Sequence, residues 1–334
     1  MRGTAFRVED YSWMAAFRLT REVTHTSVWL GAALVLALFW GTGAFERTAA
    51  KPIVRLAAVA PMIVQAAQTP PTLPRVGGGQ VGLQLYSLRH EFERAGVAPT
   101  LQRIRAMGFR YIEGGGTYGL TPQAYKAELD KAGLQMVSMM TSYDNLRFKL
   151  NDVLANAKLF GVQFLGTAWI PHEAPFSEAK AREAALVFNQ AGAASKAAGL
   201  KFFYHIHGFE FQPVAEGTLF DLMLRECKPA LVNFELDVFW ATHGGQDAAQ
   251  MLRKHPSRFL LTHLKDLRKD VQGDLTGKAP DDTSVVLGTG KINWPDVLRA
   301  AQRAGIKWHF IEAEELEAAE NIPKSLAYLK GLKF

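Results

Sequence analysis

The sequence predicts a closed (β/α)8 barrel over residues 81–334, and three observations support this fold class. From Val81 onward, short apolar runs alternate with amphipathic stretches eight times, which indicates parallel strands joined by right-handed helical crossovers. Eight such units in about 250 residues match the usual size of this barrel. Polar residues follow the apolar runs, at the strand ends where barrels carry catalytic groups. A doubly wound open sheet is the main alternative, but no glycine-rich phosphate fingerprint follows the first strand.

The first four units combine an apolar run with a helical stretch. Their strands are expected at VGLQLYS (81–87), RYIEGG (110–115), QMVSMMT (135–141) and VQFLGTAWI (162–170). Their helices are expected at 96–107, 121–132, 145–160 and 177–198. The glycines that close three of these helices, as glycine commonly does at a helix C-terminus, are Gly108, Gly133 and Gly199.

The last four units follow the same order with one long insertion. Their strands are expected at KFFYHIH (201–207), ALVNFELDV (230–238), RFLLTHLKD (258–266) and KWHFIEA (307–313). Their helices are expected at 217–226, 245–254, 294–304 and 317–331. A long polar loop is expected between the seventh strand and residue 290.

The charge distribution argues against a nucleic-acid partner. The chain has a formal net charge of +6, but eight Lys or Arg and four Asp or Glu lie within residues 1–80. Residues 81–334 therefore carry a net charge of only +2, which lacks the broad positive field that a phosphate backbone requires. The single cysteine, Cys227, rules out an internal disulfide.

The N-terminal region predicts export across a membrane. Residues 28–44 form a run of 17 uncharged residues preceded by basic ones, as in a signal peptide or a short membrane anchor. A second apolar stretch, residues 56–68, ends in small residues suited to cleavage. We assign residues 1–68 to this region and the Pro- and Gly-rich residues 69–80 to a linker. A periplasmic protein and a membrane-anchored one facing the periplasm both fit, and a buried helix of the main fold is the alternative.

Carboxylate and imidazole side chains gather at the predicted strand ends. His205 and His207 alternate in the fifth strand, so both side chains point to one face. Groups that converge in this way from neighbouring strands are typical ligands of a divalent metal, here Mn, Zn, Co, Mg or Fe. Each residue alone has a structural alternative, such as an ion pair for Glu113 or a helix cap for an aspartate. The other strand-end groups are Glu113, Glu235, Asp237, His263, Lys265, Asp266, Glu312 and Glu314.

Six short segments occur in order along the predicted barrel, namely VGLQLYSLR, YHIHGFEF, ELDVFW, THLKD, LGTGKINW and FIEAE. Together they resemble the sugar phosphate isomerase/epimerase superfamily, the xylose isomerase-like TIM barrels. The resemblance covers Val81 to Phe334 and is greatest to the branch with a YHNHDFEF-like fifth strand. It implies one divalent metal ion, held by a Glu, an Asp, a His and a Glu on strands five to eight.

The resemblance assigns these metal ligands residue by residue. Asp237 in ELDVFW, His263 in THLKD and Glu312 in FIEAE match the last three positions of the pattern. The strand-five Glu has no match, so we expect His205 to replace it, with His207 as the second choice. In family epimerases two metal-bound glutamates exchange protons on opposite sides of the substrate carbon, and only Glu312 remains of that pair.

The resemblance implies a metal-dependent sugar isomerase or epimerase that acts on a carbohydrate or keto-sugar through a metal-stabilised enediolate. We expect Glu312 to be a ligand and base, His207 the second acid or base, and Lys265 the partner of the oxyanion. Trp240 is expected to stack on an apolar sugar face, and Glu113 to bind substrate. Because one glutamate is missing, a lyase, dehydratase or keto-glycoside-cleaving enzyme of the same family is the alternative.

Two other classes of function are alternatives to this prediction. DNA repair endonucleases belong to the same superfamily, but they need several metal ions and a basic groove, which a near-neutral exported domain does not offer. A non-catalytic sugar-binding barrel is the second, and the retained Asp237, His263 and Glu312 argue against it. We therefore expect a small-molecule sugar, preferably unphosphorylated, and no nucleic acid. Glu210 is expected to anchor a loop or to support a ligand rather than to bind the metal. Barrels of this family commonly associate, so a homo-oligomer is possible.

Overall fold

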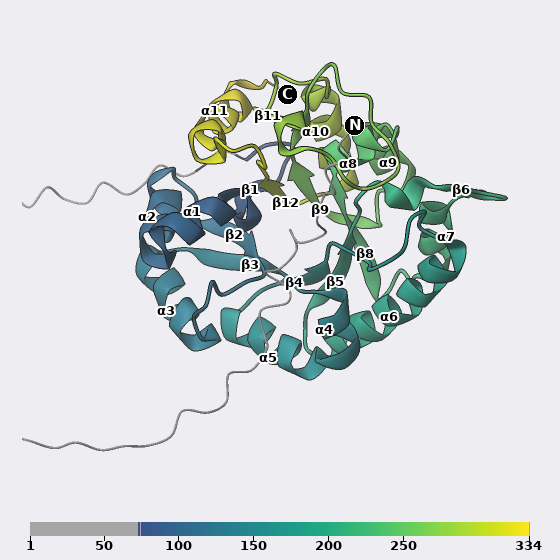
Figure 1. Ribbon diagram of the computed structural model, residues 1–334, viewed down its shortest axis with the longest axis horizontal. Helices are drawn as coiled ribbons and strands as arrows, with labels where there is room; N and C mark the ends of the chain where they lie inside the picture. Colours follow the sequence, from purple (N-terminus) through teal and green to yellow (C-terminus); the bar gives the residue numbers. More distant parts are fainter. Residues whose placement is uncertain (1–72, 74, 334) are drawn as a thin grey trace, which may run out of the picture. The chain divides into compact units, whose positions relative to one another are not determined.

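In the described part of the chain, eight parallel strands close into a barrel with helices around its outside, as predicted (Figure 1). The computed structural model describes residues 73 and 75–333. Neighbouring strands in the barrel follow the order β1-β12-β9-β8-β5-β4-β3-β2, and β1 pairs with both β2 and β12. The strands are β1 (Gln80–Gln84), β2 (Tyr111–Gly114), β3 (Gln135–Met140), β4 (Phe164–Thr167), β5 (Lys201–His205), β8 (Val232–Asp237), β9 (Phe259–Leu264) and β12 (Trp308–Ile311).

The helices lie close to their expected positions and surround the strands (Figure 1). They are α1 (Arg89–Ala95), α2 (Val97–Ala106), α3 (Pro122–Ala132), α4 (Tyr143–Phe148), α5 (Leu150–Phe160), α6 (Glu178–Ala197), α7 (Leu219–Glu226), α8 (Val238–His243), α9 (Ala248–Lys254), α10 (Trp294–Ala304) and α11 (Ala318–Gly331). Short 3-10 turns are η2 (Leu85–Leu88), η3 (Phe209–Phe211) and η4 (Asp281–Thr283). Small antiparallel pairs are formed by β6 (Pro213–Val214) with β7 (Gly217–Thr218), and by β10 (Asp266–Leu267) with β11 (Ser284–Val285).

Three helical segments differ from the prediction, and the first is α1, which was not expected. The helix expected at 145–160 is divided into α4 and α5, because Lys149 leaves the helical conformation between them. Helix α8 was not expected and begins directly after β8, where the Asp237 carboxylate accepts the backbone N–H of Trp240 at 2.8 Å. This side chain satisfies one of the free N–H groups at the start of the helix. Asp237 therefore ends a strand and caps a helix at the same time.

The seventh predicted strand also ends earlier than expected. Strand β9 stops at Leu264, and the Asp266 carboxylate instead organises the long loop that leads to α10. Asp266 is fully buried. It accepts N–H groups from Leu267 at 2.9 Å, Gly288 at 2.8 Å, Gly290 at 3.2 Å, Ile292 at 3.3 Å and the Trp294 indole at 2.9 Å. A single carboxylate thus holds both ends of this loop beside the barrel.

Aromatic side chains fill part of the barrel interior, in space left free by glycines on neighbouring strands. Phe203 on β5 and Phe310 on β12 belong to one buried cluster inside the barrel. A Cβ at Gly82 on β1 would lie 2.7 Å from the Phe310 ring, and a Cβ at Gly166 on β4 would overlap the Phe203 ring. Small residues on two strands therefore make room for large rings on two others. Polar side chains are left to occupy the carboxyl ends of the strands.

A tight turn lies just before β1, at the end of the barrel where the strands begin. Val76 is buried, and it exchanges backbone hydrogen bonds with Gly79 of 3.0 and 2.8 Å. A Cβ at Gly79 would lie 2.6 Å from the His309 ring, and Gly77 has a positive φ of 51°. Only glycine fits both positions without strain. Residues 76–79, expected as part of a linker, instead pack against the barrel.

The predicted signal peptide or membrane anchor at residues 1–68 lies outside the described residues. Within residues 73 and 75–333, none of the helices combines the length and the apolar character needed to cross a lipid bilayer.

Candidate metal centre and active site

The strand ends of β5, β8, β9 and β12 bring four of the predicted site residues together. His205 ends β5, Asp237 ends β8, His263 lies one residue before the end of β9, and Glu312 follows β12. In the strand register, Asp237 is opposite His263, and His263 is opposite Phe310, two residues before Glu312. Parallel strands in this register present their last side chains at one height, at the mouth of the barrel.

The polar atoms of these residues converge on one point. Asp237 Oδ2 lies 3.9 Å from His205 Nε2 and 3.7 Å from His263 Nδ1. One ligand atom from each of these three residues lies within 4.8 Å of the other two. Glu312 Oε2 lies 3.2 Å from the same His263 Nδ1. All four side chains are buried, and Glu312 is the most exposed at 8%.

This set of atoms fits a divalent metal ion. Zinc and similar ions bind nitrogen and oxygen at about 2.0–2.2 Å, so ligand atoms up to roughly 4 Å apart can share one ion. Asp237 Oδ1 accepts the helix α8 N–H, whereas Asp237 Oδ2 is buried and has no hydrogen-bond partner among the described residues. A buried carboxylate oxygen without a hydrogen bond is costly unless a cation faces it. The residues present therefore suit the metal that the sequence predicts.

The charges of the site are strongly coupled. Burial lowers the pKa of His263, but the carboxylates of Glu235, Glu312 and Glu113 outweigh this and raise it well above its usual value. Burial raises the pKa of Glu312, but the charges of His263 and Lys265 outweigh this and hold it well below its usual range. The site thus carries excess negative charge, which a proton on His263 or a cation can neutralise.

Two glutamates lie behind the histidines. Glu235 Oε2 is 3.0 Å from His205 Nδ1 and 3.2 Å from His263 Nε2. Glu113 Oε1 is 2.6 Å from His263 Nε2 and accepts a 2.7 Å hydrogen bond from Gln84, and Ser138 donates to its other oxygen. Glu113 and Glu235 have no exposed surface. The substrate contact predicted for Glu113 stays a prediction, and its observed partners are protein side chains.

The sequence placed Glu235 among the strand-end groups of the metal site but gave it no individual role. It lies two residues before Asp237 in the same strand, so both side chains point to one face. Burial raises the pKa of Glu235, but the charge of His263 and the hydrogen bonds from His205 and His263 lower it overall. The carboxylate is therefore an acceptor for both rings.

His207 lies beside His205 as predicted, but β5 ends at His205, so the strand expected to reach residue 207 is two residues shorter. The two ring centroids are 5.5 Å apart. Glu210 accepts the His207 backbone N–H at 3.0 and 3.1 Å and also binds the Tyr204 hydroxyl, which confirms the expected role of Glu210 as a loop anchor. Burial, followed by the charges of His205 and Lys265, lowers the pKa of His207 well below its usual value. His207 is therefore neutral near pH 7.

Trp240 and Lys265 form one wall beside His207. The Trp240 indole stacks on the His207 ring at 4.5 Å between centroids, and the Lys265 ammonium lies 5.0 Å from the centroid of the indole. Lys265 is fully buried and pairs with Glu314 at 2.6 Å. Burial lowers its pKa, but the charges of Glu314, Glu312 and Asp237 raise it overall, so the lysine is charged. Only 4% of Trp240 is exposed. The sugar contact predicted for Trp240 stays a prediction.

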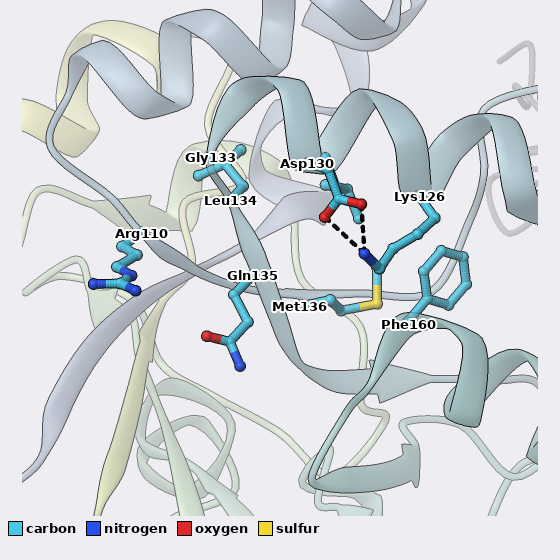
Figure 2. Close-up of a pocket in the computed structure, with 9 residues that line it drawn as sticks. Arg110, Lys126, Asp130, Gly133, Leu134, Gln135, Met136 and Phe160 are labelled. Carbon is cyan, nitrogen blue, oxygen red and sulfur yellow. Dashed lines mark hydrogen bonds and ion pairs between the residues drawn. The ribbon is translucent and has the colours of Figure 1, made fainter.

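A cavity at the other end of the barrel is separate from this site. It has a volume of about 330 Å³ and lies where β2 and β3 begin (Figure 2). Lys126 pairs there with both carboxylate oxygens of Asp130 at 2.6 Å, on the side away from Arg110 and Gln135 (Figure 2). Enzymes with this fold carry their active sites at the carboxyl ends of the strands. We therefore locate the candidate active site at the mouth formed by His205 and Asp237.

The closed parallel barrel and the side chains at its mouth define a TIM-barrel protein with a candidate metal centre. Residues 101–332 match the family model of the xylose isomerase-like TIM barrel, and the chain belongs to this family. The family resemblance found in the sequence is thereby confirmed.

Curated relatives of the chain are named as dehydratases. An inosose dehydratase of Geobacillus kaustophilus is 29% identical over 125 residues, which cover 35% of this chain and 40% of the relative. An inosose dehydratase of Erwinia tasmaniensis is 26% identical over 243 residues, which cover 64% of this chain and 81% of the relative. The chain spans only 40%, 47% and 51% of the lengths of the first three curated relatives.

A solved structure extends the similarity over the whole barrel. A sugar phosphate isomerase/epimerase from Parabacteroides distasonis is 28% identical, with a TM-score of 0.61, over 75% of this chain and 93% of that one. The prediction of an enzyme is therefore confirmed at the level of the family, whose matched members are named as isomerases, epimerases or dehydratases.

Proposed function

We propose that this protein is a divalent-metal-dependent enzyme that removes a proton next to the carbonyl group of a small polyhydroxylated ketone. The observation that carries this proposal is Asp237 Oδ2, which is buried and without a hydrogen bond among the described residues, and which faces His205 Nε2 and His263 Nδ1. These three residues and Glu312 would hold the ion. A bound divalent ion polarises a carbonyl and stabilises negative charge on its oxygen.

The residues around this centre favour elimination of water as the reaction. His207 is neutral near pH 7, and its Nδ1 has no hydrogen-bond partner among the described residues, so the ring can accept a proton. Lys265 is charged and fixed by Glu314, so it supplies positive charge where a hydroxide-like leaving group develops. A neutral base beside a fixed cation suits dehydration. A keto-inositol or related keto-sugar is the proposed substrate class, in line with the name of the curated relatives.

Isomerisation or epimerisation is the second candidate. His207 follows β5, whereas Glu312 follows β12, and two strands separate β5 from β12 around the barrel. Acid and base groups from separated strands can act on opposite faces of one carbon, as proton exchange requires. Glu312 and His207 would then be the pair.

The experiment incubates the metal-loaded full-length protein with a panel of keto-inositols and keto-sugars in D2O and follows the products by mass spectrometry. Dehydration gives a product that has lost one water. Epimerisation or isomerisation gives a product of unchanged composition with deuterium at the carbon next to the carbonyl. A His207→Asn variant serves as the control for proton transfer. If no compound loses water or gains deuterium, the catalytic proposal fails and a binding role replaces it.

We also propose that the protein is exported, on the evidence of the uncharged run at residues 28–44. Export supports unphosphorylated substrates, because phosphorylated sugars are mainly cytosolic. Alkaline phosphatase fused after residue 80 is expected to be active in a bacterial host. An inactive but expressed fusion would contradict export.

A further inference from the structure

One carboxylate oxygen contacts both candidate histidine ligands from behind. Glu235 Oε2 lies 3.0 Å from His205 Nδ1 and 3.2 Å from His263 Nε2. Its strand, β8, lies between β5 and β9 in the barrel, and Glu235 is opposite His205 in the register. Glu235 is fully buried, so water does not compete for these contacts.

The carboxylates behind the two rings indicate which nitrogen of each ring carries a proton when an ion is bound. An ionised carboxylate only accepts hydrogen bonds, so the nitrogen that faces it must be protonated. His205 therefore carries its proton on Nδ1, and His263 carries one on Nε2. The remaining nitrogens, Nε2 of His205 and Nδ1 of His263, are the ones that lie 3.9 and 3.7 Å from Asp237 Oδ2. The two rings need opposite tautomers to face the same ion. Glu235 Oε2 faces the rear nitrogen of both rings, and Glu113 Oε1 also binds that of His263 at 2.6 Å. His263 Nδ1 faces Glu312 Oε2 at 3.2 Å, so without an ion it carries a second proton, which a bound ion replaces.

We infer that Glu235 is a positioning residue of the metal centre, because its Oε2 contacts the rear nitrogen of both His205 and His263 and so holds the two rings with their other nitrogens aimed at the ion. This inference rests on the proposed metal centre and deepens it. It also explains how a histidine can act as a ligand on β5. The imidazole of His205 brings no negative charge of its own, and Glu235 supplies one directly behind it.

Glu113 provides a matched control within the same site. It binds His263 Nε2 at 2.6 Å, but no hydrogen bond joins it to His205 among the described residues. Glu113→Gln therefore disturbs the support of one ring, and Glu235 still faces that ring at 3.2 Å. Glu235→Gln disturbs both rings. An amide has one acceptor oxygen and a donating nitrogen, so it serves the two N–H groups poorly.

The test measures Zn²⁺ affinity of the full-length protein by competition with a chromophoric chelator, and the visible absorption of the Co²⁺-loaded protein. Loss of a partner behind a ligating histidine typically costs 10- to 100-fold in metal affinity. Glu235→Gln is expected to weaken Zn²⁺ binding by about that factor and to change the Co²⁺ spectrum. Glu113→Gln is expected to weaken binding less. Equal affinities and spectra for Glu235→Gln and wild type would overturn the inference while leaving the metal centre intact.

A second measurement uses the wild-type protein, so it does not depend on whether Glu235→Gln folds. Nitrogen-15 NMR of the wild-type histidines, without and with Zn²⁺, reads the protonated nitrogens directly. Protons on His205 Nδ1 and His263 Nε2 are expected in both states. A proton on His205 Nε2 would overturn the inference. If wild type binds neither Zn²⁺ nor Co²⁺, the proposed function itself fails, which is a separate result from a failure of Glu235→Gln alone.

Discussion

The ring of His207 stacks on the indole of Trp240, with 4.5 Å between the centroids and 27° between the planes. The Trp169 indole makes an edge-to-face contact with the same imidazole, with 5.3 Å between the ring centroids. The base proposed for proton transfer therefore contacts two indoles. Its backbone is fixed separately by Glu210. The position and the hydration of this imidazole depend on these neighbours.

Removal of the Trp240 indole is expected to affect stability and the pH profile together. Trp240→Ala should lower the free energy of unfolding by about 3–5 kcal/mol, as for a buried tryptophan. Because burial is the main reason that the His207 pKa is low, the variant lets water reach the ring and raises this pKa. A base must be unprotonated, so the acid limb of the rate profile moves to higher pH. Trp240→Phe keeps a ring and serves as the control. An unchanged acid limb in Trp240→Ala would contradict His207 as the base.

Two substitutions at Asp237 should separate metal binding from helix capping. Asp237→Asn keeps a side-chain oxygen that can accept the Trp240 N–H but removes the negative charge, so metal binding is lost with little change in stability. Asp237→Ala loses both and costs about 1 kcal/mol more through the missing cap. Metal content per chain and urea unfolding of the metal-free proteins check this. Full metal content in Asp237→Asn would show that the ion binds elsewhere.

The ligand set also predicts which metal the protein prefers. Two imidazoles and two carboxylates suit Zn²⁺, Co²⁺ or Fe²⁺ better than Mg²⁺, which prefers oxygen ligands alone. Zn²⁺ and Co²⁺ are expected to raise the thermal midpoint at concentrations where Mg²⁺ has no effect. His205→Glu adds a carboxylate and should shift the preference toward Mn²⁺ and Mg²⁺. Equal shifts with Zn²⁺ and Mg²⁺ in wild type would rule out nitrogen ligation by both histidines.

His309 lies at the far end of the barrel, and we expect it to make the stability of the fold sensitive to acid. Burial lowers its pKa from 6.5 to about 4. As the pH falls below 6.5, His309 binds a proton in the unfolded chain, whereas in the folded chain it stays unprotonated until about pH 4. The free energy of unfolding therefore decreases across this window, by roughly 3 kcal/mol at most from this group, and is fully retained at pH 7.

Urea unfolding at pH 7 and pH 5 checks this expectation in wild type and His309→Asn. The asparagine can still bond to Thr262, which lies 2.6 Å from His309 Nδ1, but it does not titrate. The loss of stability between the two pH values is expected to be smaller in the variant. An equal loss in both proteins would assign the acid sensitivity to other groups.

The barrel and the convergence of four site residues could be predicted because both follow from local patterns. Apolar runs separated by helical stretches define parallel strands, and the ends of parallel strands meet at one edge. That rule places His205, Asp237 and His263 among the strand-end groups, and the family resemblance singles them out as ligands. The contacts of Glu235 with the two histidine rings could not be predicted, because they depend on strand register. Likewise, residues 76–79 have the composition of a linker, and only His309, far along the chain, gives those glycines a structural role.

The turn at residues 76–79 has a consequence for where the folded barrel begins. Val76 and Gly79 exchange backbone hydrogen bonds, and Gly79 leaves no room for a side chain beside the His309 ring. The stable unit therefore starts a few residues before β1. N-terminal trimming that removes Val76 is expected to lower the thermal midpoint, because it would uncover the His309 ring.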